Sequence, residues 1–258
     1  MMWADLVSQL GSYCQQLGAL ANPDFTLSIP NFVQNAELRI YRELDFLSTR
    51  GQNTTLTFTP GNRILAFDGM TGQTVNGFPV YPSYPIVVQG LAAILPGPGQ
   101  MPGPVNPLTG VRVRFLLTSV DWIDSVWPTE SVVSPPGQPV AYYAMLDHKT
   151  AIVAPTPDQA YMAEVTGTWR PAPMSATNPE TYLGDYLWDL FFSACMVEAA
   201  GWMRDYGMQS DDPKMAMSWE ARYQSNIKNA MEEEQRRKGS DPGWQPFSPT
   251  PLSGSPRP

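Results

Sequence analysis

The sequence predicts an α+β fold in which a four-helix bundle, built from an N-terminal and a C-terminal helix pair, carries an inserted antiparallel β domain. Apolar residues recur every three or four positions near both ends of the chain, whereas they alternate with polar residues in its middle. A proline-rich end predicts an extended C-terminal tail. The predicted divisions are an N-terminal helix pair (1–50), an inserted β-rich domain with proline-rich loops (51–176), a C-terminal helix pair (177–239) and the tail (240–258).

The N-terminal division contains two amphipathic segments. The first has one apolar face from Trp3 to Leu20 and ends before the turn-forming sequence Asn22-Pro23-Asp24. The second begins after Pro30 and ends near Gly51, with apolar residues on one face and charged residues on the other. Both segments are therefore predicted to be helices that pack against a partner.

The apolar period becomes two residues after Gly51. Within Thr54–Pro60, Leu56 and Phe58 alternate with threonines, which is typical of a strand. The same reasoning predicts strands over 54–60, 63–67, 111–120, 140–146, 150–154 and 161–169, and irregular regions over 69–85 and 95–109. The second irregular region is rich in proline and glycine, so we expect a stiff loop that makes contacts instead of entering the core.

Two long helices are predicted over 178–206 and 211–239, because a capping side chain precedes a proline at the start of each. The first has aromatic side chains on more than one face, so it needs more than one packing partner. The second is apolar on one face and ends in a basic turn, which favours a half-buried helix. The residues expected in the bundle core or at a subunit interface are Tyr186, Leu190, Phe191, Trp202, Trp219, Tyr223 and Ile227.

The tail combines many prolines with a few large apolar residues. Prolines among Gly and Ser predict an extended, solvated segment that does not fold alone. Large apolar side chains in such a segment are expected to bind a partner. The candidate partner-binding residues are Trp244, Pro246, Phe247 and Leu252.

Composition disfavours several classes of protein. The chain has 258 residues and a formal net charge of −8, which argues against sequence-independent binding of nucleic acid because that requires Lys and Arg. Cys14 and Cys195 lie on apolar helix faces and are expected to be buried thiols. We expect no signal peptide and no membrane contact, because nothing reaches the ~18 apolar residues of a membrane span. The protein is therefore expected to stay soluble in a cytoplasm.

Few residues suggest catalysis. The single histidine, His148, lies in a predicted turn, and the common phosphate-loop, zinc-hydrolase and serine-hydrolase motifs are absent from the sequence. Asp121 and Asp124 lie beside Trp122 and Trp127, as in some carbohydrate clefts, but the same segment equally predicts a turn with tryptophans packed beneath it. We therefore predict that the protein is not an enzyme and has no catalytic residues, metal or cofactor.

The sequence IPNFVQNAELRIYREL, at Ile29–Leu44, is one of several segments that resemble a known family. It resembles the second helix of the head-to-tail adaptor (connector) proteins of tailed bacteriophages. The segments 182–207 and 211–239 look like its C-terminal helical hairpin, with the W-x-x-x-Y pattern matched by Trp219 and Tyr223. Trp169-Arg170-Pro171 matches the end of the family's last strand. The order of these phrases carries the resemblance, which covers the helical divisions and the last strands.

The resemblance implies a structural protein. Twelve copies would form a ring between the portal protein and the tail, extend the DNA channel and offer a docking platform to a tail or nozzle protein. DNA would pass through without specific binding, and the tail residues would bind the portal. The expected location is the virion neck, after assembly in the host cytoplasm. Two alternatives remain, a virion-associated glycan hydrolase using Asp121 or Asp124 and a β-domain binding protein.

Overall fold

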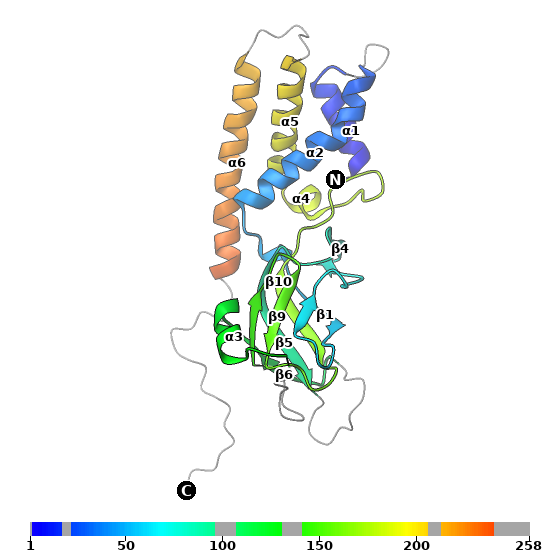
Figure 1. The fold of residues 1–258 in the computed structure, drawn as a ribbon. Coiled ribbons are helices and arrows are strands. Elements are labelled where there is room, and N and C mark those ends of the chain that lie inside the picture. Colours follow the sequence, from blue (N-terminus) through cyan, green and yellow to red (C-terminus); the bar gives the residue numbers. More distant parts are fainter. Residues whose placement is uncertain (1, 17–21, 96–106, 131–140, 206–212, 240–258) are drawn as a thin grey trace.

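The computed structural model describes residues 2–16, 22–95, 107–130, 141–205 and 213–239, and these form a mixed α+β protein (Figure 1). Long helices occupy one end of an elongated molecule and two β-sheets occupy the other (Figure 1). The helices are α1 (Trp3–Tyr13), α2 (Pro23–Glu43), α3 (Val120–Val126), α4 (Tyr182–Tyr186), α5 (Trp188–Asp205) and α6 (Pro213–Gly239), with a short 3-10 turn at Leu47–Thr49.

The helix α5 is the centre of the helical half. It contacts α1, α2, α4 and α6, which confirms the expectation that this apolar helix needs several packing partners. The helices α5 and α6 lie side by side, whereas α2 crosses them obliquely (Figure 1). The described helices therefore do not show the regular four-helix bundle that the sequence predicted, because the crossing of α2 spreads the contacts of α5 over several directions.

The boundaries of the N-terminal helices differ from the prediction. The Asn22 side chain accepts a hydrogen bond from the backbone N of Asp24 at 2.9 Å, so α2 begins at Pro23 and contains Pro30. The sequence Asn22-Pro23, interpreted as a turn, is in fact a cap followed by a proline at the first helical position. The helix α1 ends at Tyr13, shortly before Gln15, whose φ of 54° is left-handed. Leu20 lies outside the described residues.

The predicted helix over 178–206 is two helices. Its N-cap is Thr181, whose hydroxyl accepts from the backbone N of Gly184 at 3.3 Å, and the helix breaks at Leu187. The Asn178 side chain instead donates to the carbonyls of Ala172 and Pro173 at 3.0 and 3.2 Å, so it stabilises the connecting segment. The last helix, α6, begins at Pro213 as predicted.

The β half consists of two four-stranded sheets and a short hairpin. The sheet orders are β1-β10-β5-β6 and β2-β9-β8-β7, and all pairs are antiparallel except β7 with β8. The strands are β1 (Arg50–Thr57), β2 (Ile64–Ala66), β3 (Thr74–Val75), β4 (Phe78–Pro79), β5 (Val87–Leu95), β6 (Val111–Arg114), β7 (Leu116–Leu117), β8 (Tyr142–Met145), β9 (Thr150–Ala154) and β10 (Met162–Thr168).

Two strand predictions were wrong. The central strand β5 was missed, because Leu91–Ile94 are buried one after another and give no alternation. It also contains Gly90, where an added Cβ would lie 2.8 Å from the Thr166 hydroxyl, so the two strands approach closely. The segment 111–120 is not one strand but β6, β7 and the start of α3, with the Ser119 hydroxyl accepting from Trp122 N at 3.2 Å.

Each half has its own hydrophobic core. The helical core contains Leu6, Leu10, Phe25, Ile29, Ile40, Phe46, Leu183, Phe191, Met196, Tyr223 and Ile227, and the β core contains Phe58, Phe67, Met70, Leu91, Tyr143, Val153, Val165 and Trp169. Cys14 and Cys195 are both buried as free thiols, as predicted, and burial raises the pKa of Cys14 to about 11. None of the described helices has the length and apolar character needed to cross a membrane.

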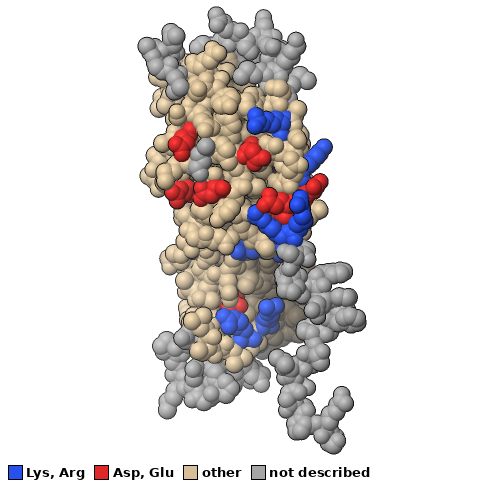
Figure 2. Space-filling model, turned by 180° about the vertical axis from the view of Figure 1, so that it is seen from behind, with Lys and Arg blue, Asp and Glu red and all other residues tan. Residues whose placement is uncertain are grey.

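Charged side chains are sparse on the surface. Asp, Glu, Lys and Arg make up 16% of the sequence, and Figure 2 shows broad areas without charge on the face seen from behind. On that face acidic side chains lie on both sides of the helical half, and basic ones lie among them on one side and also on the β half (Figure 2). Such a surface is suited to extended contacts with other proteins.

Candidate functional site

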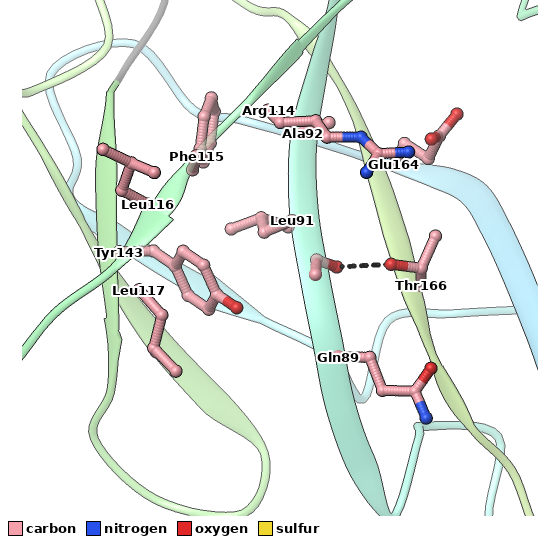
Figure 3. A pocket seen from close by; sticks show the side chains of 11 residues that line it. Gln89, Leu91, Ala92, Arg114, Phe115, Leu116, Leu117, Tyr143, Glu164 and Thr166 are labelled. Carbon is pink, nitrogen blue, oxygen red and sulfur yellow. Dashed lines mark hydrogen bonds between the residues drawn. The ribbon is translucent and has the colours of Figure 1, made fainter. Parts of the chain in front are cut away.

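A pocket opens between the two sheets of the β half. It has a volume of about 290 Å³ and lies where the chain leaves β6 and enters β7 (Figure 3). Leu116 and Leu117 on the edge strand β7 are 63% and 65% exposed, and Leu91 and Tyr143 form the floor. Two exposed leucines on an edge strand favour contact with another protein. Glu164, which also lines the pocket, forms an ion pair with Arg112 on the neighbouring surface, with 2.5 Å between Arg112 Nε and Glu164 Oε2.

The tryptophans suspected of lining a carbohydrate cleft pack on each other. The rings of Trp122 and Trp127 lie 5.5 Å apart, and those of Trp122 and Tyr142 lie 4.9 Å apart. The segment is the helix α3 and not the predicted turn, with Asp121 in its first turn and both Asp121 and Asp124 exposed. An acidic residue there stabilises the helix N-terminus, which accounts for Asp121 without catalysis.

The remaining candidates for chemistry are surface groups. His148 lies in the exposed segment between β8 and β9, with its ring 5.9 Å from that of Tyr84. Within the described residues, no three side chains of His, Cys, Asp or Glu come together in a way that could hold a metal ion. The polar groups that gather in numbers are found instead where the two halves of the molecule meet.

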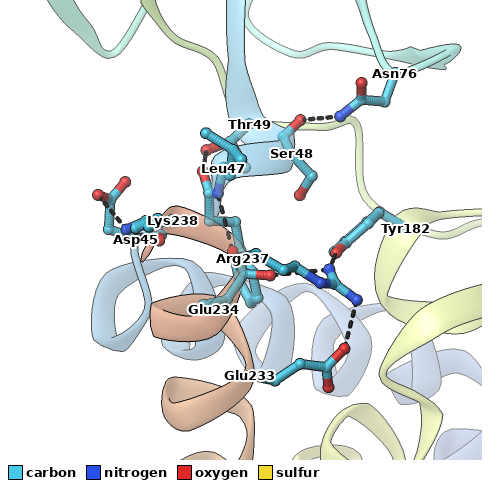
Figure 4. A network of polar contacts seen from close by, with 11 residues as sticks. Asp45, Leu47, Ser48, Thr49, Asn76, Tyr182, Glu233, Glu234, Arg237 and Lys238 are labelled. Carbon is cyan, nitrogen blue, oxygen red and sulfur yellow. Dashed lines mark hydrogen bonds and ion pairs between the residues drawn. The ribbon is translucent and has the colours of Figure 1, made fainter. Parts of the chain in front are cut away.

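A polar network fixes the end of α6 to the segment that joins α2 to β1, and to α4 (Figure 4). Lys238 Nζ lies 2.8 Å from Asp45 Oδ2, and Glu234 Oε2 accepts from the backbone N of Leu47 at 3.1 Å. Arg237 bonds Glu233 at 2.5 Å and also reaches the Tyr182 hydroxyl. The hydrogen bond from Lys238 holds the pKa of Asp45 below its usual range. Since α6 ends here, the network fixes the point from which residues 240–258 leave.

A groove lies beside this network, between the end of α2 and the strands β5 and β10. This junction groove has a volume of about 360 Å³, and its floor includes Trp169. Its lining used below consists of Tyr41, Arg42, Ile86, Val87, Trp169 and Arg170. Tyr41 and Arg170 also line an adjoining pocket of about 220 Å³ together with Glu37. Ile86 and Val87 are 43% and 53% exposed, so the groove combines an apolar wall with two cationic side chains.

The polar groups of the junction groove are incompletely paired. Arg42 and Arg170 make no ion pair with a described residue, and the Arg170 Nε and Tyr41 hydroxyl are buried without a hydrogen-bond partner there. Burial, with the nearby charge of Arg42, lowers the pKa of Arg170. Glu37 does not neutralise the two arginines, because burial raises its pKa to about 8 and so keeps the carboxyl protonated at neutral pH. Its Oε1 accepts a hydrogen bond from the backbone N of Met174 at 3.1 Å.

The residues predicted for the bundle core or a subunit interface fall into two groups. Leu190, Phe191, Tyr223 and Ile227 are buried, and Trp202 and Trp219 are partly buried against aromatic rings of α1, α2 and α5. Tyr186 is different, because it is 63% exposed and stacks on Tyr182 with ring centroids 5.0 Å apart. It projects from a surface that we call the α4 corner, formed by Glu180, Asp185, Tyr186 and Asp189, all of them exposed.

Sequence reasoning missed the junction groove. Arg42 was assigned only to the solvated face of a helix, and Arg170 was noticed only within Trp169-Arg170-Pro171. These two positions are brought together by the tertiary packing of β10 beside the end of α2. Sequence periodicity carries no signal of that packing. Trp244, Pro246, Phe247 and Leu252, the predicted tail contacts, lie outside the described residues.

Comparison with known protein families identifies the family of the chain. Residues 1–246 match the family described as SU10 adaptor protein, a family of structural phage adaptors. A search of curated proteins finds no match. The matched range includes both halves of the molecule, the junction groove and the α4 corner.

Proposed function

The chain belongs to the SU10 adaptor protein family, and we propose that it is the structural head-to-tail adaptor of a phage virion. In this proposal twelve copies form a ring in the virion neck, assembled in the host cytoplasm. The ring attaches to the portal protein, extends the DNA channel and presents a platform to a tail or nozzle protein. The observation that carries the proposal is the family match over residues 1–246.

The fold supports attachment of the tail to the portal. The end of α6 is held by Lys238 and Glu234, so residues 240–258 leave from a fixed position beside the β half. A proline-rich segment loses little conformational entropy on binding, and large aromatic residues are common hot spots. We therefore assign portal binding to Trp244, Pro246, Phe247 and Leu252.

The surface chemistry supports passage of DNA without specific binding. The net charge of −8 repels a polyanion, and a channel wall of this sign would not retain it. The uncharged surface between the few charged side chains in Figure 2 is available for contacts with neighbouring copies and with the tail or nozzle protein. Catalysis is not part of the proposal, because the tryptophans near Asp121 and Asp124 pack on one another.

The proposal is tested by reconstitution with the purified portal of the same phage. Negative-stain microscopy of the mixture is expected to show a twelve-fold ring on the portal, and sedimentation of the protein alone at micromolar concentration to show a monomer. The absence of any ring on the portal would contradict the proposal.

Truncation after Lys238 tests the tail assignment separately. The truncated chain should keep its helical circular dichroism, because all of α6 except its last residue, Gly239, remains, but lose attachment to portal-bearing heads. The double substitution Trp244→Ala and Phe247→Ala should weaken attachment by more than about tenfold, since hot-spot residues contribute ~2 kcal/mol or more. Pro256→Ala is the matched control in the same segment. Undiminished binding of the truncated chain would place the anchor in the folded part.

A further inference from the structure

The junction groove has positive charge that the described chain leaves unneutralised. Arg42 is exposed, and Arg170 reaches the same groove from the end of β10 without an ion pair to a described residue. Asp45, also on the rim, is already paired with Lys238 and Arg50. Next to these cations stands the exposed apolar wall of Ile86 and Val87. The groove therefore suits an occupant that brings a carboxylate together with a large apolar side chain.

The α4 corner offers that combination on the same molecule. Tyr186, 63% exposed, projects from it, and the exposed Asp189 follows three positions later in the sequence. A tyrosine supplies a large, rigid contact at a low cost in side-chain entropy, which is why it is frequent at interface hot spots. Its stacking on Tyr182 further orients the ring before any partner binds.

A row of aromatic rings connects the two surfaces through the junction. Tyr41 lines the groove and contacts Phe46 at 5.8 Å, Phe46 contacts Tyr182 at 5.9 Å, and Tyr182 stacks on Tyr186 at 5.0 Å. In Figure 4 Asp45, on the rim of the groove, and Tyr182 lie on opposite sides of Arg237. The groove and the corner are thus two different surfaces at the same level of the elongated molecule, where its two halves meet.

We propose that the junction groove of one copy receives the α4 corner of the next copy. Tyr186 packs against Ile86 and Val87, and Asp189 pairs with Arg42. Because the two surfaces differ and lie at one level, the contact is head-to-tail and repeats around a ring. The inference rests on the ring of the proposed function and names the surfaces that close it.

Charge reversal tests whether the two surfaces meet. Arg42→Glu and Asp189→Arg are each expected to lower the amount of ring formed on purified portal by more than about tenfold, because each creates a like-charge contact at every interface. The double variant restores opposite charges and is expected to return to within about threefold of the wild type. Lys228→Glu, the same reversal of charge at an exposed position of α6, is the matched control and should assemble normally.

A cross-link gives a second measurement that does not depend on weakened assembly. Arg42→Cys with Asp189→Cys, the two positions that the proposal pairs, should produce a ladder of disulfide-linked copies on oxidation, since Cys14 and Cys195 are buried. Normal rings from both charge variants together with no ladder would overturn the contact, as would a double variant no better than the worse single variant. If the wild type forms no ring at all, the proposed function fails and the contact with it.

Discussion

Replacement of Glu37 by Gln is expected to make folding stability less dependent on pH. Glu37 is 4% exposed, and burial raises its pKa from 4.5 to about 8, while the hydrogen bond from Met174 N acts in the opposite direction. The folded state therefore holds a proton that the unfolded state releases. Its stabilising contribution is complete below a pH of 4.5 and is lost as the pH rises through about 8.

The expected magnitude follows from this difference in pKa. Each pKa unit corresponds to ~1.4 kcal/mol, so ionisation of Glu37 costs the wild type on the order of 3 kcal/mol between about pH 5 and about pH 8. Gln cannot ionise, and its carbonyl oxygen can still accept from Met174 N. The variant should therefore be the more stable protein in mild alkali, with little difference in acid.

Urea unfolding followed by circular dichroism at about pH 5 and about pH 8 measures the effect. Other groups titrate in both proteins, so the quantity of interest is the difference between wild type and variant at each pH. Glu180→Gln, at an exposed carboxyl outside the core, is the control and should show no such difference. Equal loss of stability in wild type and Glu37→Gln, within about 0.5 kcal/mol, would refute the reasoning.

Three further outcomes are expected. Asp121→Asn and Asp124→Asn should each leave phage infectivity within about threefold of wild type, since exposed groups on a short helix rarely contribute more than ~0.5 kcal/mol to stability. Virions that assemble but are inactive would instead indicate that the protein is an enzyme. Phe191→Ala, in the buried centre of α5, should lower the free energy of unfolding by ~3–5 kcal/mol in urea titrations, and a loss below ~1 kcal/mol would mean that the site collapses. Glu234→Ala should cost ~1–3 kcal/mol by the same measurement, because it leaves the backbone N of Leu47 without its acceptor and removes one of the partners of Arg237. The neighbouring exposed Glu232→Ala should cost little.

Local sequence signals predicted the helices better than the strands. The cap and proline at Asp212-Pro213 correctly located the start of α6. The alternation of Leu56 and Phe58 indicated a strand, but β1 runs over Arg50–Thr57 and not over 54–60. The strand β5 was missed because a central strand, paired on both edges and buried over Leu91–Ile94, has no polar face to alternate with. The failure reflects tertiary burial and not weak local propensity.

The candidate site was less predictable than the fold. Tyr186 was grouped with the core residues because it continues the apolar stripe of one long predicted helix. The break at Leu187 ends that helix early and leaves Tyr186 at the exposed α4 corner, whereas Leu190 and Phe191 beyond the break remain buried. A single interrupted turn therefore converts one core position into a candidate contact. The sequence shows the residue type but not the break.

The junction of the two halves links these observations to assembly. The end of α6 is held by Lys238 and Glu234, and Tyr41 and Tyr182 connect the junction groove to the α4 corner through Phe46. A contact made at the corner would therefore act on the packed rings that lead to Tyr41 in the groove of the same copy, because close-packed interiors transmit strain. The position from which the tail leaves is fixed by the same region. Contacts between neighbouring copies and attachment of the tail are accordingly expected to reinforce each other. Occupancy of the portal by the wild-type protein should therefore rise steeply, not gradually, with protein concentration.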